Sequence, residues 1–335
     1  MNKKERISAA IHFEKADQLP YAFWSHLPGI DLDPAALAEH TYEFYKKYDL
    51  DLVKTMNNGM YPVEDFGCVA DYSEIEKGGI GKIVSTPIHH AEDLFELRPC
   101  SVSKGSLARE LYSLQLLLDK LKAEEVPVVF TVFSPITTLD KLCQKKALDY
   151  IREGHGEAAK HALRVITETT AAVVREALRL GADGVFFASQ MSTYNVMTAG
   201  EYLEYGVPYD QQVLQAAASG WINVLHAHGT NIMFDILKDY PVHAFNWHAW
   251  ESLPSIDQAK AMTGKCLMCG LERKDITDSN RSPILNQIFQ TCQITRGRGL
   301  ILTPGCVIRY PLNDDMLAYI RSAKEMVERA LFLVD

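Results

Sequence analysis

The sequence lacks long hydrophobic runs and an excess of positive charge. No stretch approaches about 18 uninterrupted apolar residues, so we expect no transmembrane helix and no membrane partner. The 34 Lys and Arg against 43 Asp and Glu give a net charge of −9, which argues against a nucleic-acid partner. The first residues lead into an amphipathic helix instead of an apolar signal core, so we expect a cytoplasmic location.

Regular cysteine spacing, nucleotide-binding glycines and repeats are also missing. Seven cysteines, an odd number spread over 335 residues, argue against a disulfide framework. No Gly-x-Gly-x-x-Gly turn follows any predicted strand, which removes the commonest nucleotide signature of a doubly wound sheet. No repeat, low-complexity run or linker divides the chain, so residues 1–335 are predicted to form a single domain.

What the sequence does contain is an alternation of short apolar runs with longer amphipathic stretches. Eight such β-then-α units predict an α/β fold of the (β/α)8 TIM-barrel type, with a doubly wound sheet as the main alternative. Asp33-Pro34 marks the start of one helix, and Gly181 marks the end of another. The predicted strands cover residues 20–26, 50–56, 127–133, 183–189, 221–227, 242–247, 264–270 and 299–304.

Residues 59–100 interrupt this alternation after the second predicted strand. Glycines divide the segment into short β-like pieces, and two of these glycines are Gly78 and Gly79. We interpret the segment as an inserted hairpin that lies over the mouth of the barrel as a lid.

The most informative motif is His226-Ala227-His228-Gly229, at the end of an apolar strand. Side chains on a strand alternate between its faces, so both imidazoles point the same way at the strand's tip. Two neutral imidazoles side by side can bind a metal such as zinc. The alternative is a hydrogen-bonded pair that lines a polar pocket.

A second candidate ligand is Cys306, which follows Pro304-Gly305 at the end of the last predicted strand. If the two strand tips converge, His226, His228 and Cys306 form a site with one open position, which is typical of catalytic zinc. The alternative for Cys306 is a buried thiol, the commonest fate of cysteine.

In a TIM barrel, catalytic and binding groups lie at the C-terminal ends of the strands and in the loops that follow. This rule selects a set of polar residues as candidate substrate contacts: Asn58, Gln190, Ser192, Asn246 and His248.

Together these motifs resemble the uroporphyrinogen decarboxylase superfamily, which includes cobalamin-dependent methyltransferases that act on thiols. The resemblance covers nearly the whole chain, from Lys3–Ile11 at its start to Leu302-Thr303-Pro304-Gly305-Cys306 near its end. In the methyltransferase branch, zinc is bound by a His-x-Cys motif on strand five and by a cysteine after Pro-Gly on strand eight. Here His226 and Cys306 match that pattern, and His228 replaces the cysteine of strand five.

The decarboxylase branch is less similar. Its members carry an Arg-Gln-Ala-Gly-Arg run that binds substrate carboxylates, whereas the corresponding run here, Trp24–Gly29, contains no arginine. Asn58 stands where the decarboxylases have an essential aspartate, and Cys306 stands where they have a histidine. An acidic protein without the arginine clamp is poorly suited to a substrate with eight carboxylates.

The resemblance therefore implies a zinc-dependent methyltransferase whose catalytic residues are His226, His228 and Cys306. It would move a methyl group from a corrinoid, carried by a partner protein, to a small-molecule thiol, and a homodimer is compatible with this assignment. Two alternatives stay open: a decarboxylase of the porphyrin-biosynthesis type, and a non-catalytic barrel that binds a small ligand or a corrinoid protein.

Overall fold

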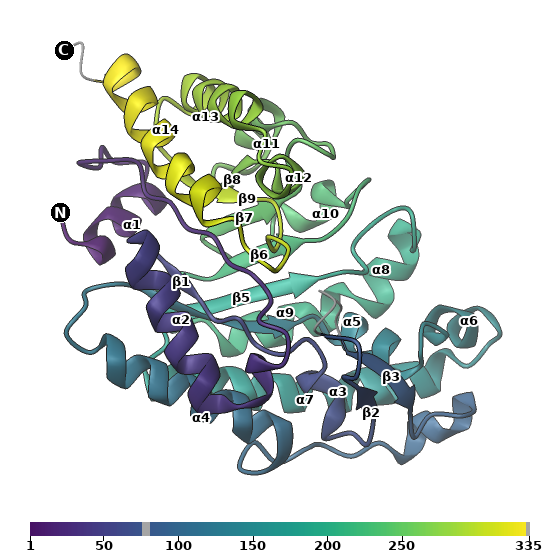
Figure 1. Cartoon of the computed structure of the whole chain (residues 1–335). Coiled ribbons are helices and arrows are strands. Elements are labelled where there is room, and N and C mark those ends of the chain that lie inside the picture. The colour runs from purple at the N-terminus through teal and green to yellow at the C-terminus, as the bar shows by residue number, and fades with distance from the viewer. Residues whose placement is uncertain (76–80, 333–335) are drawn as a thin grey trace.

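The computed structural model describes residues 1–75 and 81–332. Its centre is a curled sheet of seven parallel strands in which each strand pairs with the next of the series along the chain, a TIM-barrel-like arrangement (Figure 1). The strands are β1 (Val53–Lys54), β4 (Val128–Phe133), β5 (Gly184–Ser189), β6 (Val224–Ala227), β7 (Ala244–Trp247), β8 (Cys266–Leu271) and β9 (Leu300–Pro304).

Helices cover the sheet, with α13 and α14 on one side and α2, α4 and α7 on the other (Figure 1). The strands β5 to β9 are buried along their whole length, as expected for parallel strands covered on both faces. The helices are α1 (Lys3–Ile11), α2 (Pro34–Tyr48), α4 (Gly105–Leu121), α5 (Pro135–Leu142), α6 (Ala147–Arg152), α7 (Gly156–Leu180), α8 (Ala199–Tyr205), α9 (Val207–Ala216), α10 (Phe234–Leu237), α11 (Ile256–Thr263), α12 (Arg273–Thr277), α13 (Arg281–Thr295) and α14 (Asp314–Phe332).

Two helix ends lie where the sequence predicts them. The Asp33 side chain accepts hydrogen bonds from the first backbone N–H groups of α2, and Pro34 occupies the first turn. Gly181 ends α7 with a φ of 119°, a left-handed conformation that glycine adopts without a steric penalty.

The prediction of a strand at residues 20–26 is wrong, because this segment forms only isolated bridges. Tyr21 bridges to Leu302 of β9, and its carbonyl accepts a hydrogen bond from the N–H of Asp51 just before β1. The N–H of Tyr21, however, donates to the Asp51 carboxylate, and Pro20 has no N–H to donate. A regular ladder therefore cannot form, yet the extended segment still lies between β9 and the chain that leads into β1.

The inserted segment contains the expected hairpin. β2 (Val69–Asp71) and β3 (Lys82–Ser85) form a two-stranded antiparallel sheet, with the short helices α3 (Tyr61–Glu64) and η3 (Ala91–Glu96) on either side in sequence. Gly78 and Gly79 lie outside the described residues. The role of the segment as a lid stays a prediction.

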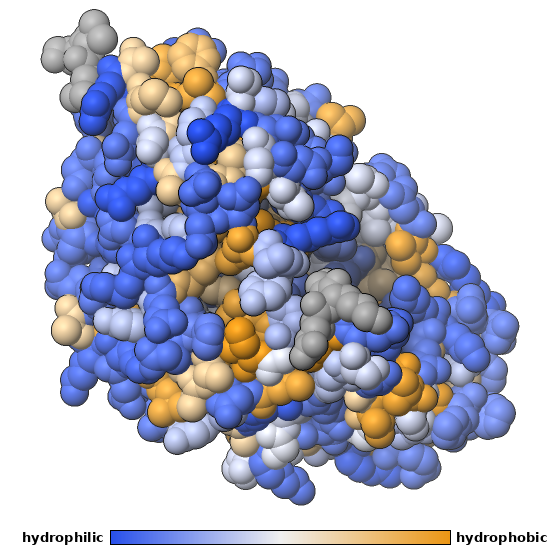
Figure 2. Space-filling model, viewed as in Figure 1, coloured by the Kyte–Doolittle hydropathy of each residue, from blue (hydrophilic) through white to orange (hydrophobic). Residues whose placement is uncertain are grey.

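The face of the molecule seen in Figure 2 is hydrophilic over most of its area and carries smaller apolar patches. No helix in the described ranges combines the length and the apolar character that a membrane span requires.

Candidate functional site

The C-terminal ends of β6 and β9 bring the three residues of the predicted metal site together. Cys306 Sγ lies 3.9 Å from His226 Nε2 and 3.7 Å from His228 Nδ1. His248, which follows β7, joins them, and the four candidate ligand atoms all lie within 4.8 Å of one another. We call His226, His228, His248 and Cys306 the His/Cys cluster.

Gly305 allows β9 to approach β7 closely enough to form the cluster. A Cβ atom at this position would lie 2.7 Å from both His248 Cα and the Trp247 carbonyl oxygen. These are backbone atoms of a buried strand end, so they cannot move aside as a flexible side chain could. The Pro-Gly-Cys motif therefore places the Cys306 thiol against the end of β7.

Asn246 fixes the orientation of the His226 ring. Its side-chain N–H groups donate to the Met268 and Pro304 carbonyls at 2.8 and 3.0 Å, which leaves its Oδ1 to face His226 Nδ1 at 2.6 Å. Since an amide oxygen can only accept, the proton lies on His226 Nδ1. The lone pair on Nε2 then points toward Cys306, as a metal ligand requires.

His248 has one ring nitrogen engaged and one free. Its Nδ1 lies 3.2 Å from the Glu251 carboxylate, which also faces Arg273 at 3.6 Å. Its Nε2 is buried and has no hydrogen-bond partner among the described residues. A buried polar atom without a partner is costly, and a metal ion in the cluster would satisfy it.

The protonation states of the cluster suit metal binding. Burial, together with the neighbouring imidazoles, lowers the pKa of His226 well below its usual value and that of His228 to about 4. Burial also lowers the pKa of His248. All three rings are therefore neutral at pH 7, which is the form that binds a metal. Burial raises the pKa of the Cys306 thiol, so it keeps its proton until a cation takes its place.

The donor set itself matches zinc. Imidazole nitrogens and thiolate sulfurs are the ligands that zinc prefers, and four of them fit its usual tetrahedral coordination. The distances between the candidate ligand atoms leave room for one ion.

Two of the predicted substrate contacts, Gln190 and Asn58, line a cavity of about 150 Å³. Gln190 follows Ser189, whose carbonyl accepts a hydrogen bond from the His228 N–H at 2.9 Å, so the strand end that precedes Gln190 lies beside the one that carries His228. Residues of the inserted segment, including Tyr72, also line this cavity.

The other predicted contacts lie elsewhere. Asn246 is fully buried behind His226, with its amide groups occupied by protein partners, so it has no free group for a substrate. Ser192 is also fully buried, and its hydroxyl has no partner among the described residues. His248 belongs to the His/Cys cluster.

The sequence interpretation missed two lysines beside the site. Lys54 on β1 is buried, with its ammonium group 4.9 Å from the Phe186 ring that stacks on His226. Lys141 lies near the end of α5 and lines the cavity. Neither follows a predicted strand, and a lysine in a helical pattern normally predicts a solvated face, so the sequence offered no signal for Lys141.

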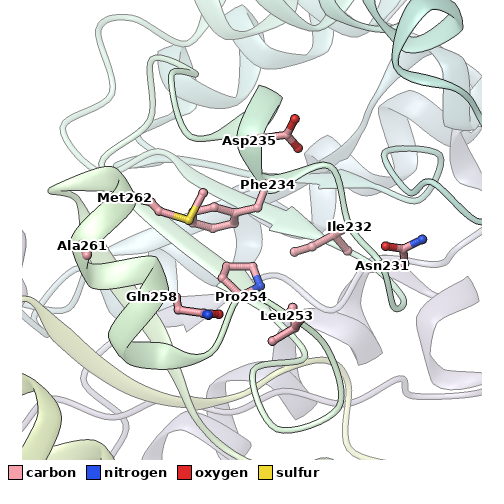
Figure 3. Close-up of a pocket in the computed structure, with 9 residues that line it drawn as sticks. All are labelled: Asn231, Ile232, Phe234, Asp235, Leu253, Pro254, Gln258, Ala261 and Met262. Carbon is pink, nitrogen blue, oxygen red and sulfur yellow. The ribbon is translucent and has the colours of Figure 1, made fainter.

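A separate hollow lies on the outside of the barrel. It is formed by α10 and the loop before it, together with α11 and the loop before that helix, and Figure 3 shows Phe234, Pro254 and Met262 around it. None of the His/Cys cluster residues lines this hollow, so it is a different surface feature.

Comparison with known proteins agrees with this architecture. The family model for uroporphyrinogen decarboxylase (URO-D) matches residues 2–323. A methyltransferase from Methanosarcina mazei has a similar structure, with a TM-score of 0.83 and 16% sequence identity over 97% of this chain and 99% of that chain. No curated protein matches the sequence significantly.

A B12-independent methionine synthase from Shewanella sp. W3-18-1 is also similar in fold. Its TM-score is 0.60 at 13% identity, and the match covers 96% of this chain and 98% of that chain. A putative vitamin-B12 independent methionine synthase from Listeria monocytogenes has the same TM-score at 10% identity, over 93% of this chain and 99% of that chain. At such low identities these structures establish the shared fold.

Proposed function

Since the chain belongs to the uroporphyrinogen decarboxylase family of enzymes, we propose that it is a zinc-dependent methyltransferase that methylates a small-molecule thiol. The observation that carries this proposal is the His/Cys cluster, in which four donor atoms of the type zinc prefers lie within 4.8 Å of one another at the C-terminal ends of the strands.

In this proposal His226, His228 and Cys306 bind the ion. When bound, zinc would lower the pKa of an acceptor thiol, so that a thiolate forms near neutral pH. Asn246 holds the His226 ring with its Nε2 lone pair toward the site. His248 has a free Nε2 at the same place, so it is either a fourth ligand that the acceptor thiol displaces or a contact for the acceptor.

The methyl donor in this proposal is a methylated corrinoid carried by a partner protein. The acceptor sulfur forms a bond to the methyl carbon while the methyl–cobalt bond breaks, and that electron pair stays on cobalt. The corrinoid thus supplies the difficult chemistry, and the barrel supplies the position of the nucleophile.

The similarity of the fold to that of the M. mazei methyltransferase supports the proposal of a methyl transfer. In the same proposal, the inserted segment 59–100 would close over the site or contact the corrinoid protein.

Metal analysis of the purified protein tests the proposal first. We expect about one zinc per chain in the unchanged protein, and much less in His228→Ala, because that variant removes a ligand. His40→Ala is the matched control, since His40 is exposed on α2, and it should keep its zinc. Equal zinc contents in the two variants, or a protein without zinc, would contradict the proposed ligand set.

An activity assay then distinguishes the chemistry. Methylcobalamin and a small thiol should give the methylated thiol, detected by mass spectrometry, and Cys306→Ser should abolish the reaction. Release of carbon dioxide from uroporphyrinogen would instead identify a decarboxylase.

A further inference from the structure

A cavity of about 1190 Å³ lies at the end of the barrel opposite the His/Cys cluster. The chain after α1, the loop before β9, and the helices α11, α13 and α14 bound it (Figure 1). That loop leads into Leu300, the first residue of β9, whereas Cys306 follows the last residue of the same strand. Pockets for small-molecule ligands measure about 300–1,000 Å³, so this cavity is large enough for such a ligand.

Positively charged side chains from four segments of the chain line this cavity. They are Lys15 after α1, Lys260 on α11, Arg296 and Arg298 before β9, and Arg329 on α14. The Lys260 ammonium group donates to the Ile294 carbonyl at 2.8 Å, so it serves the C-terminal end of α13. The other four side chains form no hydrogen bond or ion pair within residues 1–75 and 81–332.

The carboxylates that line the cavity are paired with cations that do not line it. The pairs are Asp17 with Arg6 (2.8 Å) and with the N-terminal ammonium group (3.0 Å), Glu325 with Arg321 (3.5 Å), and Glu328 with Lys324 (3.1 Å). The charge of the described cavity wall is therefore positive, although the net charge of the protein is −9. A concave surface of one charge attracts ligands of the opposite charge.

The loop that carries the two arginines is fixed and lies against an aromatic ring. The Arg298 N–H donates to the Thr295 carbonyl at 3.2 Å. Gly299 lies so close to Phe13 that a Cβ atom at this glycine would clash with the Phe13 ring. Since Phe13 lines the cavity together with Leu19 and Leu331, the cavity combines unpaired cations with an apolar wall.

We propose that this cavity binds a nucleotide, that is, a small ligand with a polyphosphate group and a planar ring. Lys15, Arg296 and Arg298 bind the phosphate oxygens, because guanidinium groups match phosphate geometry and a multiply charged group can contact several cations at once. The Phe13 ring packs against the base. This site is separate from the His/Cys cluster, and the inference does not depend on the proposed methyl transfer.

The distribution of charge favours a small ligand over a nucleic acid. A nucleic-acid interface needs a basic surface that contacts many phosphates, and such domains usually carry a positive net charge. Here the unpaired cations line one cavity of an acidic protein.

Calorimetric titration of the whole protein with ADP, adenosine and pyrophosphate tests the proposal, in about 0.15 M salt to screen weak surface binding. We expect ADP to bind at least about tenfold more tightly than adenosine, which lacks the phosphates, and than pyrophosphate, which lacks the ring. The proposal is overturned if about 1 mM ADP gives no binding, or if either of the other two probes binds as tightly as ADP.

Substitutions in the cavity then locate the bound ADP. We expect the double variant Lys15→Ala/Arg298→Ala to raise the dissociation constant for ADP at least about tenfold, and each single variant at least about threefold. Arg175→Ala is the matched control, since Arg175 is exposed on α7 and also forms no ion pair within the described residues. Variants that bind ADP as tightly as this control overturn the proposal.

Thermal unfolding keeps these results interpretable. Without ligand it shows whether each variant is folded, and the single variants serve if the double variant is not. ADP should raise the Tm of the unchanged protein and of Arg175→Ala, and it should raise the Tm of the cavity variants much less.

His228→Ala separates this cavity from the proposed zinc site. A diphosphate can also coordinate a metal ion, so ADP could bind at the cluster instead. We expect His228→Ala to bind ADP like the unchanged protein, because the two sites lie at opposite ends of the barrel. Loss of ADP binding in this variant overturns the inference, whereas the zinc content of the same variant tests the proposed function independently.

Discussion

At the scale of single residues, the site depends on Asn246, which is not one of the candidate metal ligands but orients His226, which is. The Asn246 amide is held by the Met268 and Pro304 carbonyls, and this fixed amide decides which nitrogen of His226 carries the proton. Phe186 stacks on the same ring, with centroids 5.5 Å apart. The His226 imidazole is thus positioned before any metal arrives, which reduces the entropy lost on binding.

Replacement of this amide should weaken metal binding. We predict that Asn246→Ala lowers the affinity for zinc by about 10- to 100-fold, because the His226 ring loses the group that fixes its tautomer and orientation. Competition with a chelating dye measures the affinity. Asn286→Ala is the control, since Asn286 is exposed on α13, and its affinity should be unchanged. Wild-type affinity in Asn246→Ala would show that the amide has no part in positioning His226.

At the scale of secondary-structure elements, the contact between the ends of β7 and β9 sets the shape of the cluster. We predict that Gly305→Ala lowers both the zinc affinity and the stability, the latter by about 1–3 kcal/mol. The added methyl group would meet the backbone of Trp247 and His248 and push Cys306 away from His248. Metal analysis and thermal unfolding measure the two effects.

Gly200 provides the matched control for that substitution. It lies in α8, and a Cβ atom there would meet nothing within 4 Å, so Gly200→Ala should bind zinc normally and be at least as stable as the unchanged protein. A Gly305→Ala variant with wild-type zinc affinity would mean that the close approach of the two strand ends does not shape the site.

A buried carboxylate joins α9 to two other segments and makes stability depend on pH. Asp210 of α9 accepts hydrogen bonds from Tyr202 of α8 at 2.6 Å and from Tyr240, just before β7, at 2.9 Å. Burial raises its pKa to about 7, above the value of about 4 expected in the unfolded chain. The folded protein therefore binds the additional proton between these values, and the free energy of unfolding falls as the pH rises through this window.

Asp210→Asn should remove this contribution. The amide oxygen can still accept from both tyrosines, and no charge is buried at high pH. We predict that, between pH 5 and pH 8, the variant loses less stability than the unchanged protein, as measured by urea unfolding. Asp119→Asn, at an exposed aspartate of α4, should keep the original dependence. If the two variants show the same slope, Asp210 is not the group responsible.

The sequence predicts most of the parallel strands and three of the four residues of the His/Cys cluster as metal ligands, whereas it predicts the fourth, His248, as a substrate contact. Short apolar runs between amphipathic stretches favour buried strands, and the two side chains of a His-x-His pair at a strand end face the same way. The irregular segment at residues 20–26 was not foreseeable, because its pairing depends on the Asp51 side chain. The Lys141 ammonium group is held by the Gly59 carbonyl, 82 residues away in the chain, and local sequence does not encode such a contact.

At the scale of the whole molecule, the region where the two ends of the sheet meet is held by charge as well as by hydrogen bonds. The Arg6 guanidinium of α1 contacts the buried Asp51 carboxylate, and it also pairs with Asp17 at 2.8 Å. The other Asp51 oxygen accepts from the Tyr21 N–H, in the segment beside β9. One ion pair thus connects α1, the segment that borders β9 and the chain that enters β1.

Arg6→Ala should therefore weaken the entire molecule. Removing the cation leaves the Asp51 carboxylate buried without its counter-charge, and the loss of one partner of a buried pair costs about 3–5 kcal/mol. We predict a decrease of that size in the free energy of unfolding, measured with urea, and loss of zinc only to the extent that the protein unfolds. Arg179→Ala removes an exposed pair with Glu176 and should change the stability little. An Arg6→Ala variant as stable as Arg179→Ala would show that hydrogen bonds and packing alone hold the two ends of the sheet together.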